Sequence, residues 1–207
     1  MKPLKKTNCT WSSKFAYVIG LIASDGNLSS DGRHVIFTSK DEELALLFKR
    51  YTKHKGKISK KSRGGSNEKN YFYVQIGDVN FYKFLLSIGL TQRKSHTIGK
   101  LDIPKKFFYD FLRGCIDGDG SIGIFRHPQS KYPQFKIRLV SASKQFLEWV
   151  QGITNRDGIK GFFTISKTIH VLAYAKNDSI KLSNLIYYSG YPPSLSRKSS
   201  VAKKFIL

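Results

Sequence analysis

The 207-residue chain has few cysteines and no long apolar run, and these absences exclude several classes of protein. Its two cysteines, Cys9 and Cys115, are too few to build a disulfide framework or a zinc site by themselves. No segment approaches the roughly 20 consecutive apolar residues that span a bilayer. The basic first residues lead into no apolar segment, so no secretion signal is indicated. We therefore expect an intracellular protein of a reducing compartment, in the cytoplasm or nucleoid or in an organelle, that is neither secreted nor bound to a membrane.

Acidic residues are also scarce. The chain holds 14 Asp and Glu against 36 Lys and Arg, which gives a formal net charge of +22. An excess of this size destabilises the compact state by self-repulsion, so it usually serves binding to a polyanion. Nucleic acid is the favoured partner, because each phosphate that the protein neutralises releases counterions. A basic surface without a partner and an anionic membrane are the alternatives, but the sequence contains no basic amphipathic helix of the membrane-surface kind.

The sequence repeats itself at about half its length. Residues 15–26 find an echo in residues 109–120, where each segment combines an apolar stripe with small residues and ends in Asp-Gly. A second echo follows in each half, an Arg-Lys-Ser sequence at residues 93–95 and 197–199. Such internal repetition predicts two copies of one structural unit.

Both halves show strand-like and helical patterns in the same order. The helical patterns that follow the first repeated segment lie at residues 41–53 and 79–88 in the first half, and at 144–153 and 179–189 in the second. Each half is therefore predicted to run α-β-β-α-β-β-α. The predicted domains are residues 1–98 and 105–207, joined by a linker of turn-forming residues at 99–104.

The two repeated helices each carry small or short residues at every fourth position. These residues are Ala16, Gly20 and Ser24 in the first helix and, at matching places, Asp110, Gly114 and Gly118 in the second. A glycine inside a helix costs on the order of 1 kcal/mol relative to alanine, and its benefit is a close approach of two backbones. If the helices cross at these residues, Asp25 and Asp119 meet at their C-terminal ends. Gly26 and Gly120, which follow, are expected in the left-handed conformation that ends many helices.

Two converging carboxylates at the negative ends of two helix dipoles repel one another. A divalent cation relieves this repulsion, and a hard ion such as Mg²⁺ takes carboxylate oxygens together with water and phosphate. The alternative is that both aspartates are solvated end residues without a joint role. The joint duplication of the helix, the small residues and the Asp-Gly pair favours the metal site.

The repeated segments resemble a known motif. Residues 18–26 and 112–120 are similar to the two copies of the motif that names the LAGLIDADG homing endonucleases, and the Arg-Lys-Ser echoes resemble the basic element that closes each half in that family. The resemblance covers almost the whole chain. It implies an α+β fold of two pseudo-symmetric αββαββα halves, in which two antiparallel four-stranded sheets form a saddle for double-stranded DNA and pack on two central helices. A monomer is implied, because both copies lie in one chain.

The resemblance also implies roles for four residues. The last acidic residue of each motif copy, here Asp25 and Asp119, is the family's metal ligand. The implied cofactor is Mg²⁺ or Mn²⁺, with Ca²⁺ able to replace it without cleavage. Lys94 and Lys198 stand where the family often places a lysine near the scissile phosphates, and they are expected to stabilise the transition state or help to activate water.

Two further motif positions are less symmetric. Asp117 matches an earlier acidic position of the motif, where the first copy has Ala23, so no essential second ligand is expected there. The family commonly keeps a polar residue before the helix that follows the first hairpin. Ser39 takes this place in the first half, and either Ser141 or Ala142 takes it in the second.

Sequence readout is expected from strand side chains that face away from the helices, where they reach the major groove. Many of the lysines are expected to contact only phosphate. The expected DNA-binding residues are Asn27, Ser29, Arg33, His34, Lys61, Arg63, Asn67, Lys69, Tyr73 and Gln75 in the first half, and Ser121, Phe125, His127, Lys136, Arg138, Lys160, Ser166, Lys167 and His170 in the second. Because the halves differ at nearly all of these positions, the target is expected to be long and asymmetric.

The function implied is a site-specific double-stranded DNA endonuclease that makes a staggered cut by divalent-metal-dependent phosphodiester hydrolysis. Two alternatives use the same fold. One is an intron RNA maturase, which the basic charge suits equally well. The other is a DNA-binding protein that has lost cleavage, although such a loss often removes the motif acids and both persist here.

Overall fold

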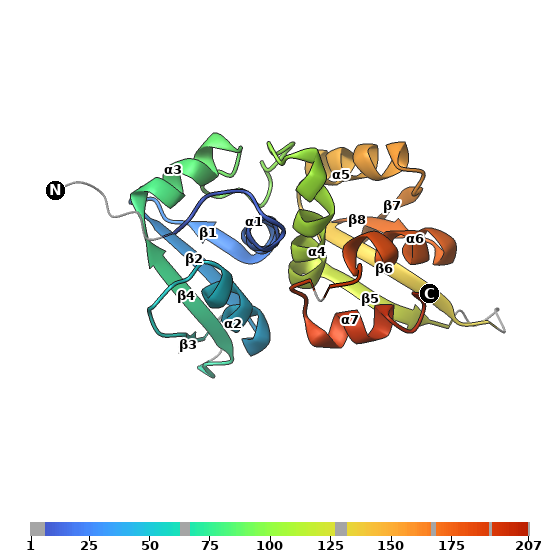
Figure 1. Ribbon diagram of the computed structural model, residues 1–207, viewed down its shortest axis with the longest axis horizontal. Helices are drawn as coiled ribbons and strands as arrows, with labels where there is room; N and C mark the ends of the chain where they lie inside the picture. Colours follow the sequence, from blue (N-terminus) through green and yellow to red (C-terminus); the bar gives the residue numbers. More distant parts are fainter. Residues whose placement is uncertain (1–6, 63–66, 127–131, 167–168, 191, 207) are drawn as a thin grey trace.

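A computed structural model describes residues 7–62, 67–126, 132–166, 169–190 and 192–206. It shows two halves of similar construction side by side, with one long helix of each half at the centre (Figure 1). Within the part of the chain that is described, no helix is both long and apolar enough to cross a membrane.

In its described residues, the first half contains three helices and a four-stranded antiparallel sheet with strand order β1-β2-β4-β3. Side chains cap two of its helices: Ser12 Oγ accepts from the Phe15 N–H at 3.2 Å, and the Asp78 carboxylate accepts from the N–H groups of Asn80 and Phe81. The elements are α1 (Ser13–Asp25), β1 (Gly26–Leu28), β2 (His34–Ser39), α2 (Glu42–Tyr51), β3 (Ser59–Lys61), β4 (Tyr71–Gly77) and α3 (Val79–Ser87).

The second half repeats this order and ends in an additional short helix. Its sheet is also antiparallel, with strand order β5-β6-β8-β7. The elements are the 3₁₀ turn η1 (Lys105–Phe107), α4 (Phe108–Asp119), β5 (Gly120–Phe125), β6 (Gln134–Ser141), α5 (Lys144–Arg156), β7 (Gly161–Ser166), β8 (Ile169–Tyr174), α6 (Lys176–Ile186) and α7 (Ser196–Ala202). The α+β architecture with duplicated halves is therefore confirmed. The short helix α7 carries the second Arg-Lys-Ser echo, whereas the first echo lies in turns.

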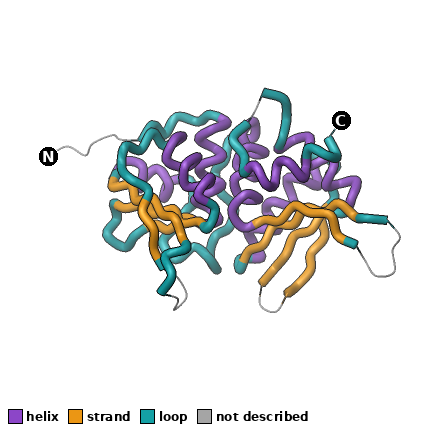
Figure 2. Tube along the Cα trace, turned by 90° about the horizontal axis from the view of Figure 1, so that it is seen from below, coloured by secondary structure: helices purple, strands orange, loops and turns teal. Residues whose placement is uncertain are grey.

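Helices cover one face of each sheet, and the other face is open. Both sheets lie on one side of the molecule (Figure 2). Alternation within the strands explains the layering, since in β2 and β4 the side chains of Val35, Phe37, Val74 and Ile76 are fully buried while their neighbours are less so. One continuous apolar core runs through both halves, because α1 and α4 contribute to it from the centre.

The glycines of α1 and α4 allow the two central helices to cross at very short range. A Cβ atom on Gly20 would lie 2.1 Å from the Phe111 carbonyl oxygen, and one on Gly114 would lie 2.2 Å from the Tyr17 carbonyl oxygen. Farther along, a Cβ on Gly118 would lie 2.0 Å from Ser24 Oγ. The crossing expected from the small residues is therefore confirmed.

The expectation of a left-handed conformation for the two glycines after the motif helices is wrong. Gly26 has φ −84° and Gly120 has φ −93°, both extended, because a strand begins directly after each aspartate. Glycine is required there for space: an added Cβ would lie 2.6 Å from the Ile22 Cα in the first case and 2.7 Å from the Ile116 Cα in the second. After each aspartate the chain therefore turns from helix into strand while its backbone packs on the last turn of that helix.

Candidate active site

Asp25 and Asp119 are the last residues of α1 and α4, and the crossing of these helices brings both to one cavity. Asp25 is half-buried and Asp119 is exposed. The cavity opens beside the first sheet and is lined by Ser24, Asp25, Gly26, Asn27, Ile36, Thr38, Lys61, Lys94, Ser95 and Asp119. The structure thus places the two carboxylates together, as the sequence predicts, and adds polar groups of β1, β2 and β3 around them.

Two buried lysines close the ends of the same two helices. Lys94 Nζ donates to the carbonyl oxygens of Ser24 at 3.3 Å and Gly26 at 2.7 Å. Lys198 Nζ donates to those of Ile116, Asp117 and Gly120, at 2.7, 2.8 and 2.7 Å. The last carbonyls of a helix have no partner within it and carry its negative dipole end, so a buried ammonium satisfies and neutralises them.

The two ammonium groups differ in how many hydrogen bonds they donate to the main chain. Burial lowers the pKa of Lys94, and the nearby carboxylates of Asp119 and Asp25 oppose this effect. Burial likewise lowers the pKa of Lys198 to about 8, against the attraction of Asp117. Lys198 uses all three N–H groups on main-chain oxygens, whereas Lys94 donates to two such oxygens and lines the cavity.

The donor set of the cavity suits a hard divalent cation that is shared with a substrate. Asp25 and Asp119 offer carboxylate oxygens, the ligands that Mg²⁺ and Ca²⁺ prefer. Among the described residues, no group of three or more His, Cys, Asp or Glu side chains could hold a metal by itself. The carboxylate pair therefore fits a cation whose remaining ligands are water and phosphate oxygens, not a closed protein site.

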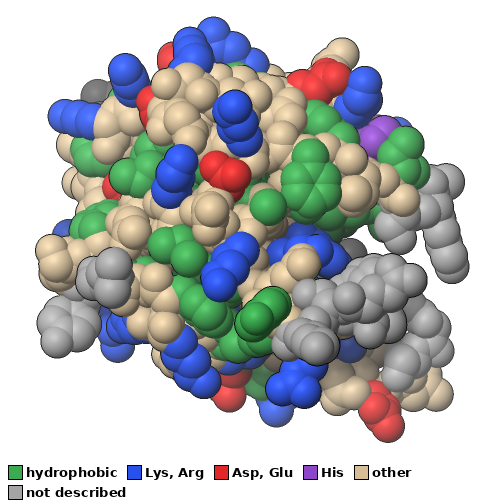
Figure 3. Space-filling view, turned by 90° about the vertical axis from the view of Figure 1, so that its right-hand side faces the viewer, with side chains coloured by type: hydrophobic (Ala, Val, Ile, Leu, Met, Phe, Trp, Pro, Cys, Tyr) green, Lys and Arg blue, Asp and Glu red, His purple; other side chains and the backbone are tan. Residues whose placement is uncertain are grey.

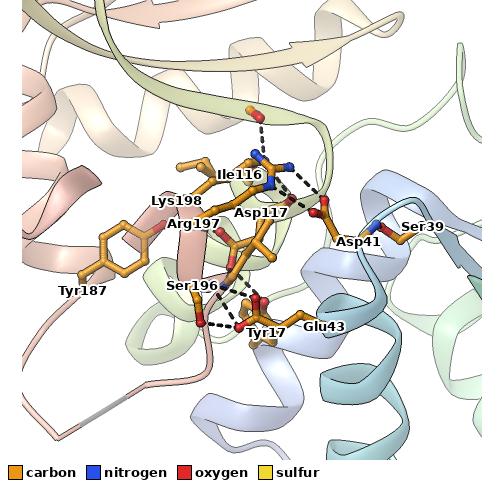
Figure 4. Close-up of polar contacts among 12 residues, drawn as sticks. Tyr17, Ser39, Asp41, Glu43, Ile116, Asp117, Tyr187, Ser196, Arg197 and Lys198 are labelled. Atoms are coloured by element: carbon orange, nitrogen blue, oxygen red, sulfur yellow. Dashed lines mark hydrogen bonds and ion pairs between the residues drawn. The ribbon is translucent and has the colours of Figure 1, made fainter. Parts of the chain in front are cut away.

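Asp117 of α4 lies inside the protein, between α1 and the segment that joins α6 to α7. Its carboxylate is fully buried and accepts hydrogen bonds from the Tyr17 hydroxyl at 2.8 Å, the Leu195 N–H at 2.7 Å and the Tyr187 hydroxyl at 3.3 Å (Figure 4). Burial raises the pKa of Asp117 to about 6, and these hydrogen bonds only partly offset that effect. The residue does not line the cavity that holds Asp25 and Asp119.

Replacing Asp117 with asparagine is expected to change how stability depends on pH. A carboxyl group with a pKa of about 6 when folded and about 3.9 when unfolded takes up a proton on folding, so its contribution to the free energy of unfolding falls as pH rises from about 4 to about 6. The full fall is about 2–3 kcal/mol. Asp117→Asn has no such group, and urea unfolding between pH 4 and 7 should show a flatter profile by that amount.

The exposed carboxylate of Asp102 provides the matched control, because Asp102→Asn makes the same chemical change outside the core. This control should keep the parent's pH profile. If Asp117→Asn and the parent lose stability in parallel over this range, then Asp117 does not titrate as its burial implies.

A clasp of ion pairs and hydrogen bonds joins α7 of the second half to the start of α2 in the first (Figure 4). Arg197 donates to both carboxylate oxygens of Asp41, at 3.0 and 2.8 Å. The main-chain N–H and the hydroxyl of Ser196 both donate to Glu43. Because Lys198 directly follows Arg197, the clasp also fixes the segment that caps α4.

The serines at the ends of β2 and β6 have matching roles. Ser39 Oγ accepts from the Asp41 N–H at 3.1 Å, and Ser141 Oγ accepts from the Ser143 N–H at the same distance. Ser141, not Ala142, is therefore the counterpart of Ser39. Both hydroxyl groups stabilise the turn from strand to helix.

The open face of the first sheet carries half of the residues expected in the first half, namely Asn27, His34, Lys61, Tyr73 and Gln75. Register places Asn27 opposite Ile36 and Ile36 opposite Gln75, and it places Thr38 opposite Tyr73, all on the face away from the helices. Lys61 of β3 lies on the same face, with Nζ 5.3 Å from the Tyr73 ring centre. His34, the first residue of β2, also lies on this face and contacts Asp31. Sequence reasoning missed Ile36 and Thr38, which line the cavity. Their strand is nearly continuously apolar in sequence, so it gives no clear alternation between the two faces.

The remaining expected residues of the first half lie outside the strands. Arg33, Asn67 and Lys69 are exposed in loops. Ser29 is half-buried after β1, and its carbonyl oxygen accepts from the Tyr82 hydroxyl at 2.7 Å. Three expected residues lie outside the described part of the chain: Arg63, His127 and Lys167.

The second sheet presents Ser121, Phe125, Lys136 and Arg138 on its open face, as expected. Ser121 lies opposite Arg138, Phe125 lies opposite Gln134, and the Arg138 guanidinium is 4.2 Å from the Phe125 ring centre. Lys and Arg side chains also spread over the end of the molecule that this half forms (Figure 3).

At the far edge of this sheet one expectation is wrong. Lys160 is exposed just before β7, and the backbone of Ser166 pairs with Ile169. His170 pairs with Ser141 and Ile165, which puts it on the face opposite to Arg138. A shift of one residue in register moves every side chain of a strand to the other face, and alternation alone did not fix the register of this hairpin.

A family model for the LAGLIDADG-like domain matches residues 12–89 and 109–182 of the chain. Among curated proteins, an uncharacterized protein of Methanocaldococcus jannaschii is 24% identical over 157 residues, which are 72% of this chain and 58% of that protein. The chain thus spans less than two thirds of the length of this curated relative.

Solved structures share the fold. I-DmoI in complex with DNA and Mn has a TM-score of 0.59 and 19% identity, covering 86% of this chain and 98% of its own. The homing endonuclease I-WcaI bound to its DNA recognition sequence has a TM-score of 0.67 and 14% identity, covering 93% and 88%. Full-length DUF199/WhiA of Thermotoga maritima has a TM-score of 0.57 and 14% identity, covering 97% and 63%. At these identities the likeness shows a common fold.

Proposed function

Because the chain belongs to the LAGLIDADG-like family, we propose that it is a site-specific endonuclease that makes a staggered double-strand break in a long, asymmetric DNA target. The observation that carries the proposal is the convergence of Asp25 and Asp119 at one cavity beside an open sheet face. Two similar acidic helix ends at one centre suit the two antiparallel strands of a duplex. Both halves lie in one chain, so the protein acts as a monomer.

The open faces of the two sheets are the proposed DNA-binding surface. The major groove is about 12 Å wide, admits β-ribbons and presents a different pattern for each base pair. The side chains of Asn27, Tyr73 and Gln75 offer donors and acceptors to base edges from the first sheet. The net charge of +22 supports binding to the phosphates, which positions the protein without specifying sequence.

Asp25 and Asp119 are the residues that would hold a divalent cation. When bound, such a cation stabilises charge on the phosphate and generates a nucleophilic water at neutral pH. The metals in the relatives support this assignment, since I-DmoI was solved with DNA and Mn and with DNA and Ca. Mg²⁺ is the proposed physiological ion, because Mg²⁺ commonly keeps several waters and binds through one or two carboxylates plus substrate phosphates.

The two lysines have different proposed roles. Lys94 lines the cavity and has a third N–H beyond the two it donates to main-chain oxygens, so it contacts the scissile phosphate. Lys198 uses its three N–H groups on the end of α4 and is a positioning residue for Asp119. This division departs from the symmetric role that the sequence alone suggests.

Replacing Lys94 with methionine is therefore expected to slow single-turnover cleavage by about a hundredfold or more, as the loss of one transition-state donor does, while the Kd for DNA changes little. Lys198→Met is expected to act chiefly on stability, with a loss of about 3 kcal/mol, because three buried carbonyl oxygens lose their donor. Cleavage rates and urea unfolding of both variants should be measured at a temperature where both are folded. An equal slowing of cleavage in the two would show that the lysines act alike.

A cleavage selection from a randomised duplex library tests the proposed function directly. The protein is incubated with the library in Mg²⁺ and, in parallel, in EDTA, and the cut ends are sequenced. A single long target, cut only with Mg²⁺, is the expected result. Recovery of specifically bound but uncut DNA would show that the protein binds DNA without cleaving it. Binding confined to structured RNA would support a maturase. Either result overturns the nuclease proposal.

A further inference from the structure

The open face of the second sheet is apolar at its centre, unlike that of the first. The hollow on this face is lined by four polar residues, Ser121, Lys136, Arg138 and Thr164, and by five apolar ones. We call the apolar members the apolar patch; they are Val140, Phe162, Ile169, Val171 and Ala173. Phe162 is 44% exposed and Ile169 is 43% exposed, whereas Val171 and Ala173 are only 9% and 3% exposed.

The register shows that the patch is a continuous surface of three strands. Val140 of β6 lies opposite Val171 of β8, and Ala173 of β8 lies opposite Phe162 of β7. Helices cover the other face of this sheet, so the exposed side chains of Phe162 and Ile169 lie on the side away from them. Contiguous exposed apolar side chains with a polar rim mark a binding surface.

The surroundings of the patch indicate the chemistry of what it binds. Arg138 pairs across the sheet with Ser121 at the start of β5, directly after Asp119, so the patch and its cationic rim continue the surface that begins at the active site. Lys136 and Arg138 favour a polyanion. A surface that meets a polyanion through apolar side chains needs apolar groups on that polyanion, and in the DNA major groove these are the C5-methyl groups of thymine.

We propose that the apolar patch reads thymine methyl groups, so that the half of the target beneath the second sheet contains a short thymine-rich run; this proposal rests on the proposed function. Three neighbouring strands span about 10 Å, which matches about three base steps of 3.4 Å. Valine and phenylalanine also leave the amino groups of adenine and cytosine without a partner, so they disfavour these bases as well as favouring thymine. The polar face of the first sheet has no comparable preference.

Replacement of thymine by deoxyuridine tests this proposal, because it removes only the methyl group. The Kd of the protein for its selected target is measured by fluorescence anisotropy, in Ca²⁺ to prevent cutting, with deoxyuridine in one half, the other half or neither. Substitution beneath the second sheet is expected to weaken binding about fourfold for each buried methyl group, and tenfold or more in total. The same substitution in the other half should change Kd less than twofold.

A pair of isosteric variants identifies which half lies beneath which sheet. Val140→Thr with Val171→Thr keeps the shape of the patch but adds hydroxyl groups, and it should abolish the effect of deoxyuridine in one half only. Val79→Thr makes the same chemical change in α3, outside both the hollow and the active-site cavity, and as the matched control it should leave that effect intact. Ile169→Thr serves as an independent variant should the double variant unfold, as judged by circular dichroism.

The outcomes separate this proposal from the proposed function. Specific binding that is indifferent to deoxyuridine in both halves overturns the thymine proposal and leaves the endonuclease intact. Absence of any specific DNA target overturns the endonuclease and, with it, the thymine reading. If Val140→Thr with Val171→Thr instead abolishes self-association in sedimentation while the deoxyuridine effect is absent, the patch is an interface between two copies.

Discussion

Asp25→Asn or Asp119→Asn is expected to reduce double-strand cleavage at least about a thousandfold while the protein still binds its target. Both carboxylates line the cavity where α1 and α4 end, and each would hold a cation against the scissile phosphates. The loss of a metal's charge stabilisation removes several kcal/mol from the transition state, and each 1.36 kcal/mol is worth a factor of ten in rate. Asparagine keeps the shape of aspartate and removes a negative charge facing phosphate, so Kd should stay the same or fall.

The measurement uses a supercoiled plasmid that carries the selected target, so that nicked and linear products can be separated, with anisotropy for binding. Asp102→Asn is the matched control, since Asp102 is exposed and does not line the cavity. It should cut at the parent's rate. If Asp25→Asn or Asp119→Asn produces linear DNA as fast as Asp102→Asn does, the metal assignment fails and the proposed mechanism fails with it.

The sequence was sufficient to predict the architecture because duplication doubles each signal. A single Asp-Gly at a helix end is common, but Asp25 and Asp119 recur with the same small residues before them. Gly20 and Gly114 predicted the helix crossing, since glycine within a helix is retained only where a backbone comes close. The order of strands and helices followed from periodicity in the same way.

Sequence reasoning failed where the outcome depends on contacts between distant segments. The partners of Lys198 are carbonyl oxygens some 80 residues away, which carry no side-chain signal. His170 was misplaced because its face depends on hairpin register. Val140 and Val171 lie in apolar runs of the sequence, and only the strand register shows that their side chains are on the face away from the helices.

The clasp between α7 and α2 also could not be foreseen. The acidic run at residues 41–43 suits the positive end of a helix dipole, and this local role gives no sign of a partner in the other half. The structure adds Arg197 and Ser196 as partners from the other half. The lysines that close the two motif helices therefore stand on different local structure, turns in the first half and α7 in the second, and the pseudo-symmetry is lower than the sequence repeat suggests.

Gly114→Ala is expected to lower the free energy of unfolding by at least about 3 kcal/mol, at or above the upper end of the usual cost of overpacking. The added methyl group would lie 2.2 Å from the Tyr17 carbonyl oxygen, and because this neighbour is main chain in the middle of α1, the two helices can avoid the clash only by separating. Such a separation opens the core that both halves share. Gly20→Ala makes the reciprocal clash, 2.1 Å from the Phe111 carbonyl oxygen, and should cost about as much.

Gly152→Ala is the control that isolates the crossing from helix propensity. Gly152 lies inside α5, and an added Cβ there has no neighbour within 4 Å among the described residues, so the substitution should stabilise the protein by up to about 1 kcal/mol. The urea midpoints of Gly114→Ala and Gly20→Ala should therefore fall below that of the parent, and the midpoint of Gly152→Ala should rise above it. Equal stabilisation of Gly114→Ala and Gly152→Ala would mean that α1 and α4 do not meet at their glycines, and the convergence of Asp25 and Asp119 would then have no structural cause.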